Sequence, residues 1–129
     1  MIFKSTGEYL RDAKVTKITP SNGDHQQGEI TFLALPGEGL TFVVLANLSE
    51  EDKVKKVSGT KAEVLKNFEY TVTADTDFAK TGLPMWGELA QQTIDPDVSA
   101  VQTIGTIHLL RAVARVDVGL NMTCLLYTS

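Results

Sequence analysis

The sequence predicts an all-β protein, a β-sandwich with one or two short helices. Segments rich in β-branched and aromatic residues recur along the chain, and clusters of Gly, Pro, Asn and Asp separate them. Strands and helices do not alternate, so nothing indicates a parallel sheet covered by helices. With 129 residues and 43% hydrophobic content, the chain has the size and composition of one globular domain.

The residue pattern in the first part of the chain predicts two pairs of strands. Residues 2–4 and 9–18 flank a glycine that permits a tight reversal, and together they predict a hairpin. Turn-forming residues at 20–28 predict an exposed loop. Residues 29–35 and 40–47 predict the second pair. Because the middle of 40–47 is apolar on both faces, this segment is expected to be a central strand with packing on each side.

Two short helices are expected after these strands. Ser49 precedes three acidic residues, an arrangement that caps the first turn of a helix and suits its dipole, so a helix is predicted to about residue 57. Thr60 and Glu63 have the spacing of a capping box, in which each side chain bonds the backbone amide of the other residue. This box predicts a second helix to about Asn67.

The last part of the chain predicts two more strands. Residues 68–74 alternate apolar and polar side chains, as a strand with one buried face does. Residues 77–102 contain glycine and proline at several positions and are predicted to be mostly irregular. Residues 105–120 show the most regular alternation and predict a long strand. Its buried face is expected to carry His108, Leu110, Ala112, Ala114, Val116, Val118 and Leu120.

The sequence contains no arrangement typical of an enzyme. It has neither a phosphate-binding glycine loop nor a glycine-flanked nucleophilic serine. His25, His108 and Cys124 are too few and too widely spaced for a structural metal site. We therefore expect no catalytic residue, no cofactor and no metal. A net charge of −4 gives no broad basic surface, so nucleic acid is not an expected partner.

The two ends of the sequence bear on what kind of fragment it is. The start lacks the basic end, apolar stretch and cleavage site of a secretory signal, so the protein is either cytosolic or begins further upstream. Residues 124–129 read as the translation of a transposon adapter used in DNA sequencing, and they are excluded from the fold prediction. The natural part is then expected to be residues 1–123, a truncated N-terminal β-sandwich domain.

Three motifs carry a resemblance to a known family. They occupy residues 42–48, 82–87 and 107–118 and read FVVLANL, GLPMWG and IHLLRAVARVDV. In this order and spacing, the chain resembles the fimbrillin family of major pilus subunits, the type V pilins. The last motif is the most specific. The resemblance runs across nearly all of residues 1–121 and corresponds to the N-terminal domain of a subunit that normally has a second β domain.

The resemblance implies a transthyretin-like Greek-key sandwich and secretion as a lipoprotein precursor. It implies a place at the cell surface, in a fimbrium or at the outer membrane, with membrane contact only through a lipid anchor on an N-terminal part that this chain lacks. Other pilin subunits are the implied partners, and they form a homopolymer by strand exchange after removal of a first strand. The groove for the exchanged strand is expected to be lined by apolar residues that also suit a closed core: Val43, Leu45, Leu110, Ala112 and Val116.

The chain departs from the family pattern in three ways. It lacks the signal with its lipid-bearing cysteine, it shows no removable first strand with a cleavage site, and it stops before the second domain. No cleavage residue is therefore assigned. Arg111 and Arg115 are expected to cover apolar surface with their aliphatic stems rather than to mark a processing site.

Two functions follow from the resemblance and the residues. The first is a structural subunit of a bacterial surface fimbria that supports adhesion. The alternative is an accessory or tip adhesin that binds host glycan or protein through exposed groups at Tyr70, Trp86 or residues 20–28.

Overall fold

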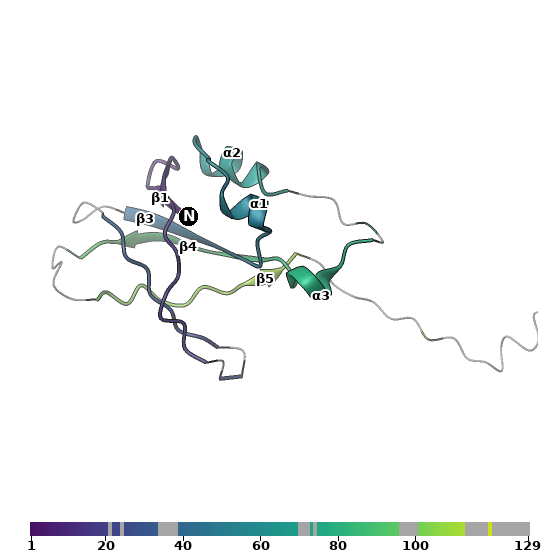
Figure 1. Cartoon of the computed structure of the whole chain (residues 1–129). Helices are drawn as coiled ribbons and strands as arrows, with labels where there is room; N and C mark the ends of the chain where they lie inside the picture. The colour runs from purple at the N-terminus through teal and green to yellow at the C-terminus, as the bar shows by residue number, and fades with distance from the viewer. Residues whose placement is uncertain are drawn as a thin grey trace, which may run out of the picture.

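A computed structural model of the chain describes residues 1–20, 22–23, 25–33, 39–69, 73, 75–95, 101–112 and 119. In this part of the chain, one five-stranded antiparallel sheet in the order β2-β1-β3-β4-β5 is accompanied by three short helices (Figure 1). The strands are β1 (Ile2–Lys4), β2 (Tyr9–Arg11), β3 (Gly39–Ala46), β4 (Met85–Thr93) and β5 (Leu110–Arg111). The helices are α1 (Glu50–Lys53), α2 (Lys61–Lys66) and α3 (Phe78–Thr81). The prediction of an all-β protein with few short helices is confirmed.

The sheet has a core on each face, and β1 and β3 contribute to both. Ile2, Leu40 and Phe42 are buried on one face, which we call the first core. Phe3 and Val43 are buried on the other face with Val64 of α2, which we call the second core. Successive residues of a strand point to opposite faces, so one strand can supply both cores only if it is covered on both sides. The prediction that residues 40–47 form a central strand is confirmed.

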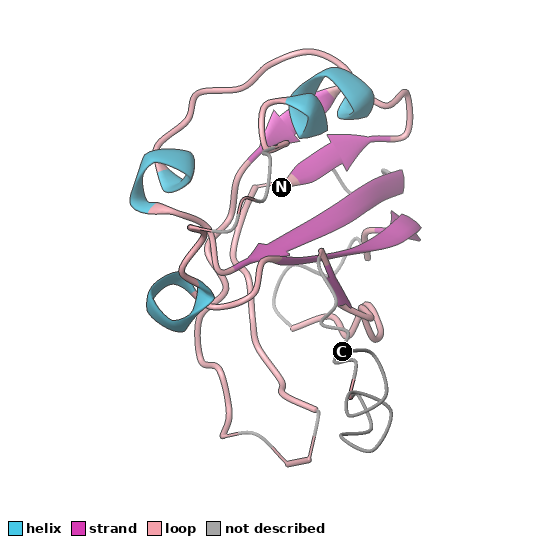
Figure 2. Ribbon diagram, turned by 90° about the vertical axis from the view of Figure 1, so that its right-hand side faces the viewer, coloured by secondary structure: helices cyan, strands magenta, loops and turns pink. Residues whose placement is uncertain are grey.

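The two faces are covered by different kinds of structure. Figure 1 shows α1 and α2 above β3 and β4, and Figure 2 shows them again on one side of the sheet. On the opposite side, Leu10 of β2 and segments outside the strands cover the first core. The half-buried residues from these segments are Ala13, Ile30, Phe32, Ile94, Ile104 and Ile107. The second sheet expected for a sandwich is therefore not formed within the described residues, where helices and extended chain take its place.

The predicted N-terminal hairpin is present but shorter than expected. Gly7 adopts a φ of 89° in the reversal between β1 and β2, and the Lys4 amide donates to the carbonyl of Glu8. The second strand ends at Arg11 rather than at residue 18. Beyond it, the described residues between 14 and 30 form an arm that projects from the sheet, with one bridge between Thr16 and Glu29 near its base and another between Asn22 and His25 (Figures 1 and 2).

The strand predicted at residues 29–35 is wrong over the described residues 29–33. Only the bridge of Glu29 belongs to it there, and residues 34 and 35 lie outside the described part. This segment contributes to the first core without pairing as a strand. The ring of Phe32 packs edge-on against Phe42, with ring centroids 5.9 Å apart.

Both predicted helices are confirmed. Ser49 caps α1 by accepting from the amide of Asp52 at 3.1 Å. Thr60 and Glu63 form the predicted capping box at the start of α2, with each side chain bonded to the other residue's amide. The first helix ends at Lys53, earlier than predicted.

The prediction that residues 77–102 are mostly irregular is wrong. They contain α3 and the nine-residue strand β4, which pairs with β3 from Met85 to Thr93. Its sequence is poor in β-branched residues, but pairing along β3 stabilises a strand that local propensity does not favour. Gly87 lies within β4 and does not interrupt it. Glycine is required there because another part of the chain passes so close on the first-core side that a Cβ would not fit.

The long strand predicted at residues 105–120 is wrong over its described part. Only Leu110 and Arg111 are in a strand, and residues 101–109 lie outside any strand. His108, Leu110 and Ala112, expected on a buried face, are exposed. The reason is the packing of Ile104 and Ile107 into the first core, which draws this segment beneath the sheet. The remaining residues of that predicted face lie outside the described residues, as does most of the strand predicted at 68–74.

Candidate functional site, the outer edge of strand β4

The two edges of β4 are paired to very different extents. The inner edge pairs with β3 along its length, from Ala46 opposite Met85 to Gly39 opposite Thr93. The outer edge pairs with β5 only at Met85 and Trp86, and one further bond joins the Ala112 amide to the carbonyl of Pro84 at 2.9 Å. Most of the outer edge therefore carries no strand partner among the described residues.

Glu88 is the first residue of this open edge. Backbone groups of an antiparallel strand point alternately to its two neighbours. Pro84 and Trp86 face the β5 side, so Glu88, two residues further on, directs its N–H and C=O to the same side. Within the described part of the chain, no backbone group lies hydrogen-bonded to them. An edge of this kind is a template for an added strand.

The side chain of Glu88 faces the second core and is fixed there by α2. Its carboxylate accepts from Lys61 Nζ at 2.6 Å, and the two side chains are 26% and 38% exposed. Glu88 lies opposite Val43 of β3, so this ion pair joins the first residue of α2 to the edge strand. The pair therefore connects the start of α2 to the edge strand.

Exposed apolar side chains lie next to the open edge. Leu45, Trp86 and Leu110 are cross-strand neighbours on the face of the second core, one each from β3, β4 and β5. Trp86 is 41% exposed and Leu110 is 61% exposed. Aromatic and aliphatic side chains left uncovered at the end of a sheet are typical of a surface that receives a partner.

A family model described as "Fimbrillin-A associated anchor proteins Mfa1 and Mfa2" matches residues 1–127. The chain belongs to this family. Neither the curated proteins nor the solved structures contain a match to it.

Membership in the fimbrillin-A associated anchor family gives the protein a coarse role. It is a fimbria-associated subunit or anchor protein, it is associated with the cell-surface fimbria, and its partners are other fimbrial subunits. The resemblance to fimbrillins drawn from the three sequence motifs is thereby confirmed at the level of the family.

The residues expected to line a strand groove lie at different places in this family member. Val43 is 1% exposed and belongs to the second core, whereas Leu45 is half-buried beside it. Leu110 is exposed on β5, and the exposed Ala112 extends the pairing with β4 by one bond. Val116 lies outside the described residues. Trp86 lies between Leu45 and Leu110 as the cross-strand neighbour of both, so the three side chains form one row. Val43 is buried in the core and is not part of this row.

Sequence reasoning missed the outer edge of β4, although a signal was present. Gly82 and Pro84 are turn-forming residues, and no further proline occurs before residue 96. A segment of this length between turn signals has the size of a strand. The glycine at 87 outweighed that signal in the prediction, because its role depends on a contact with distant chain.

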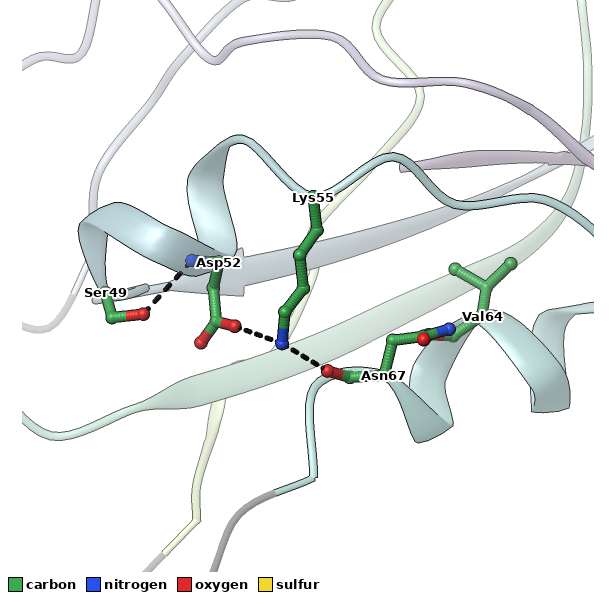
Figure 3. A network of polar contacts seen from close by, with 5 residues as sticks. All are labelled: Ser49, Asp52, Lys55, Val64 and Asn67. Atoms are coloured by element: carbon green, nitrogen blue, oxygen red, sulfur yellow. Dashed lines mark hydrogen bonds and ion pairs between the residues drawn. The ribbon is translucent and has the colours of Figure 1, made fainter.

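A polar network ties the two helices above the sheet to each other (Figure 3). Lys55 Nζ lies 2.6 Å from a carboxylate oxygen of Asp52 and donates to the carbonyl of Asn67, also at 2.6 Å. The same ammonium lies 5.5 Å from the centre of the Phe68 ring. Lys55 therefore links the end of α1 to the end of α2.

The hydrogen bond from Lys55 holds the pKa of Asp52 below its ordinary value, and the Ser49 hydroxyl adds to this effect. A depressed carboxyl pKa in the folded state contributes stability above the unfolded pKa of about 3.9, and this stability is lost as pH falls through the folded pKa. Asp52→Asn is expected to flatten the fall in unfolding free energy between about pH 5 and about pH 3. Because the pair is near the surface, the effect is expected to stay below about 1 kcal/mol.

Urea unfolding of the two proteins at a series of pH values measures this difference. Glu50→Gln is the matched control, because Glu50 pairs with Lys53 on the same helix and its side chain is 90% exposed. Equal pH profiles for wild type and Asp52→Asn would show that the network does not stabilise the fold.

Neither a metal site nor a membrane span is evident in the described part of the protein. No group of three or more His, Cys, Asp and Glu side chains gathers there in a way that could hold a metal ion. No helix among these residues has the length and apolar character to cross a membrane.

Proposed function

We propose that the protein is a structural subunit of a bacterial surface fimbria, and that it joins a neighbouring subunit by accepting a strand along the outer edge of β4. The observation that supports this most is the unequal pairing of β4, a nine-residue strand whose outer side is paired to β5 at two residues. An added strand satisfies the backbone groups of an open edge and places alternate side chains against the two faces of the sheet.

The surroundings of the edge suit such a strand. An incoming segment that pairs with Glu88 continues the line of β5, so its second-core side chains reach the apolar row of Leu45, Trp86 and Leu110. In this proposal Leu45 and Leu110 are the groove residues that contact the partner, and Val43 supports them from the core. The Lys61–Glu88 pair involves the side chain of Glu88, whereas docking uses its backbone groups.

Co-assembly tests the proposal. The purified protein is mixed with the fimbrial subunits of the same cells, and the products are separated by electrophoresis in SDS without heating. Strand addition is expected to give complexes that survive SDS, because backbone ladders and buried side chains dissociate slowly. A protein that stays monomeric while the other subunits polymerise would contradict the proposal.

Attachment to the outer membrane through a lipid is a separate part of the proposal. It rests on the family resemblance, since fimbrillins are secreted as lipoprotein precursors. Growth of cells that express the complete gene with a labelled fatty acid should label the protein. Unlabelled protein in cells whose other lipoproteins are labelled would contradict lipid attachment. The proposal of strand addition would not be affected by that result.

A second candidate function, an accessory adhesin, is favoured by the arm of residues 14–30. The arm projects from the sheet (Figure 2) and is held in shape by its own bonds, such as the Thr19 amide to the carbonyl of Gln27 at 2.9 Å. It presents the exposed side chains of Ile18 and Gln26. Glycan-array binding that is lost in Gln26→Ala while assembly is retained would support adhesion through the arm.

A further inference from the structure

The segment that follows residue 101 lies next to the open edge without pairing to it. Residues 101–109 run beneath β4 in Figure 1 and make no backbone hydrogen bond to the rest of the described chain. Two side-chain attachments hold them. Gln102 bonds the Thr93 carbonyl at 2.8 Å and the Asp95 amide at 2.7 Å, and Ile104 and Ile107 pack into the first core.

Gly87 makes this position possible. Gly87 is buried, and a Cβ at this residue would meet the carbonyl oxygen and carbon of His108 and the side chain of Ile107. The backbone of His108 therefore passes directly over Gly87 on the first-core face. Any other residue at position 87 would push the segment away from that face.

The same segment is also in register to become a strand on the open edge. Met85 lies opposite Arg111 and Trp86 opposite Leu110, so each step forward along β4 is one step back along the segment. Continuation of this ladder places His108 opposite Glu88 as a hydrogen-bonded pair, like the pairs at Trp86 and Pro84. Ile107 would then lie opposite Leu89 and still face the first core.

From these contacts we propose that residues 103–109 are a strap with two positions. In the observed position the strap lies beneath β4 over Gly87, and the edge at Glu88 is open. In the second position the strap extends β5 along β4 and closes that edge. Because the strap and an incoming strand compete for the same backbone groups, the strap regulates docking at the site, an inference that rests on the proposed function of the β4 edge.

The two positions exchange one set of contacts for another. The observed position has the side-chain attachments and leaves the backbone of the strap to solvent. The second position gains ladder bonds and keeps Ile107 on the first-core side. A partner strand that binds only where the edge is open shifts the population toward the observed position.

Amide hydrogen exchange of the complete chain tests the strap. The Glu88 amide is expected to exchange freely in the observed position and to be protected in the second. Gly87→Ala places a methyl group against the His108 backbone, so it is expected to slow exchange at Glu88 by about tenfold or more. Gly39→Ala is the matched control, because a Cβ there meets only Ser5, at 3.8 Å.

A second substitution makes the test independent of folding defects in Gly87→Ala. His108→Pro removes the donor that the second position needs, whereas His108→Ala retains it. The partial protection that Glu88 gains from wild-type molecules in the second position should be lost in His108→Pro and kept in His108→Ala. Equal exchange at Glu88 in all these proteins, with the Val44 and Leu89 amides still protected, would overturn the strap.

Failure of the strap is distinguishable from failure of the proposed function. If Gly87→Ala protects Glu88 and also reduces SDS-resistant assembly by about tenfold, the strap and the docking edge both stand. If Glu88 becomes protected but neither protein assembles, the strap stands and the docking function fails. If assembly proceeds equally in wild type and Gly87→Ala with unchanged exchange, the strap fails and the docking edge stands.

Discussion

Phe3→Ala is expected to lower the free energy of unfolding by about 3–5 kcal/mol. Phe3 is completely buried in the second core, and its ring packs edge-on against Tyr9 at 6.0 Å. It lies on β1, opposite Thr41 of the central strand, so the cavity left by its removal opens between β1, β3 and α2. A domain with a total stability of about 5–15 kcal/mol would lose much of it. Urea denaturation followed by circular dichroism measures the change.

The control for this prediction is an exposed apolar residue. Leu33 is 80% exposed, and Leu33→Ala is expected to change the free energy of unfolding by less than about 0.5 kcal/mol. A similar loss for both variants would show that burial in the second core does not stabilise the fold.

Glu88→Pro is expected to reduce assembly with fimbrial subunits by about tenfold or more. Proline removes the edge amide of Glu88, so the carbonyl of the incoming strand is left without its donor, which costs about 1–3 kcal/mol, and about 1.4 kcal/mol is tenfold in affinity. The pairing with β3 is expected to survive, because proline is tolerated where the missing N–H faces away from the neighbouring strand. The yield of SDS-resistant complex measures the effect.

Loss of the Lys61–Glu88 ion pair must be separated from loss of the amide. Glu88→Ala removes the carboxylate and retains the N–H, so it is the matched control and is expected to assemble nearly as well as the wild type. Equal assembly of Glu88→Pro and wild type, with both proteins folded, would exclude a strand ladder at this position.

The central strand could be predicted from the sequence because its signal is local and strong. Leu40, Phe42 and Val43 are apolar at consecutive and alternate positions, which only a strand covered on both faces accommodates. The helices were predictable for a similar reason. Ser49, Thr60 and Glu63 each accept from an amide three residues away, so the residues that decide these boundaries are neighbours in the sequence.

Strand β4 and the segment after residue 101 were not predictable, because distant contacts decide them. Gly87 marks a break in a local pattern, and only the passage of His108 over it explains why glycine is required. The alternation at residues 105–112 matches a strand, but Ile104 and Ile107 pack into the first core while the segment lies outside the ladder. Strand β5 is therefore short, and the side chain of its first residue, Leu110, is exposed rather than buried.

The candidate site was only partly predictable for the same reason. The apolar residues Leu45 and Leu110 stood out in the sequence, and the structure places both beside Trp86. Glu88 carries no apolar signal, and its importance comes from the direction of its backbone at an unpaired edge. Whether the edge of a strand is open depends on the path of the neighbouring segment. The residues of the edge strand alone do not determine it.

Hydrogen exchange of the Glu88 amide in the free and the fimbria-assembled protein tests the central claim most directly. The Leu89 amide, on the side of β4 paired with β3, is the internal reference. Strand addition at the outer edge is expected to slow exchange at Glu88 by about a hundredfold or more on assembly, with little change at Leu89. Equal exchange at Glu88 in the two states, in a sample shown to be fully assembled, would contradict docking at the edge of β4.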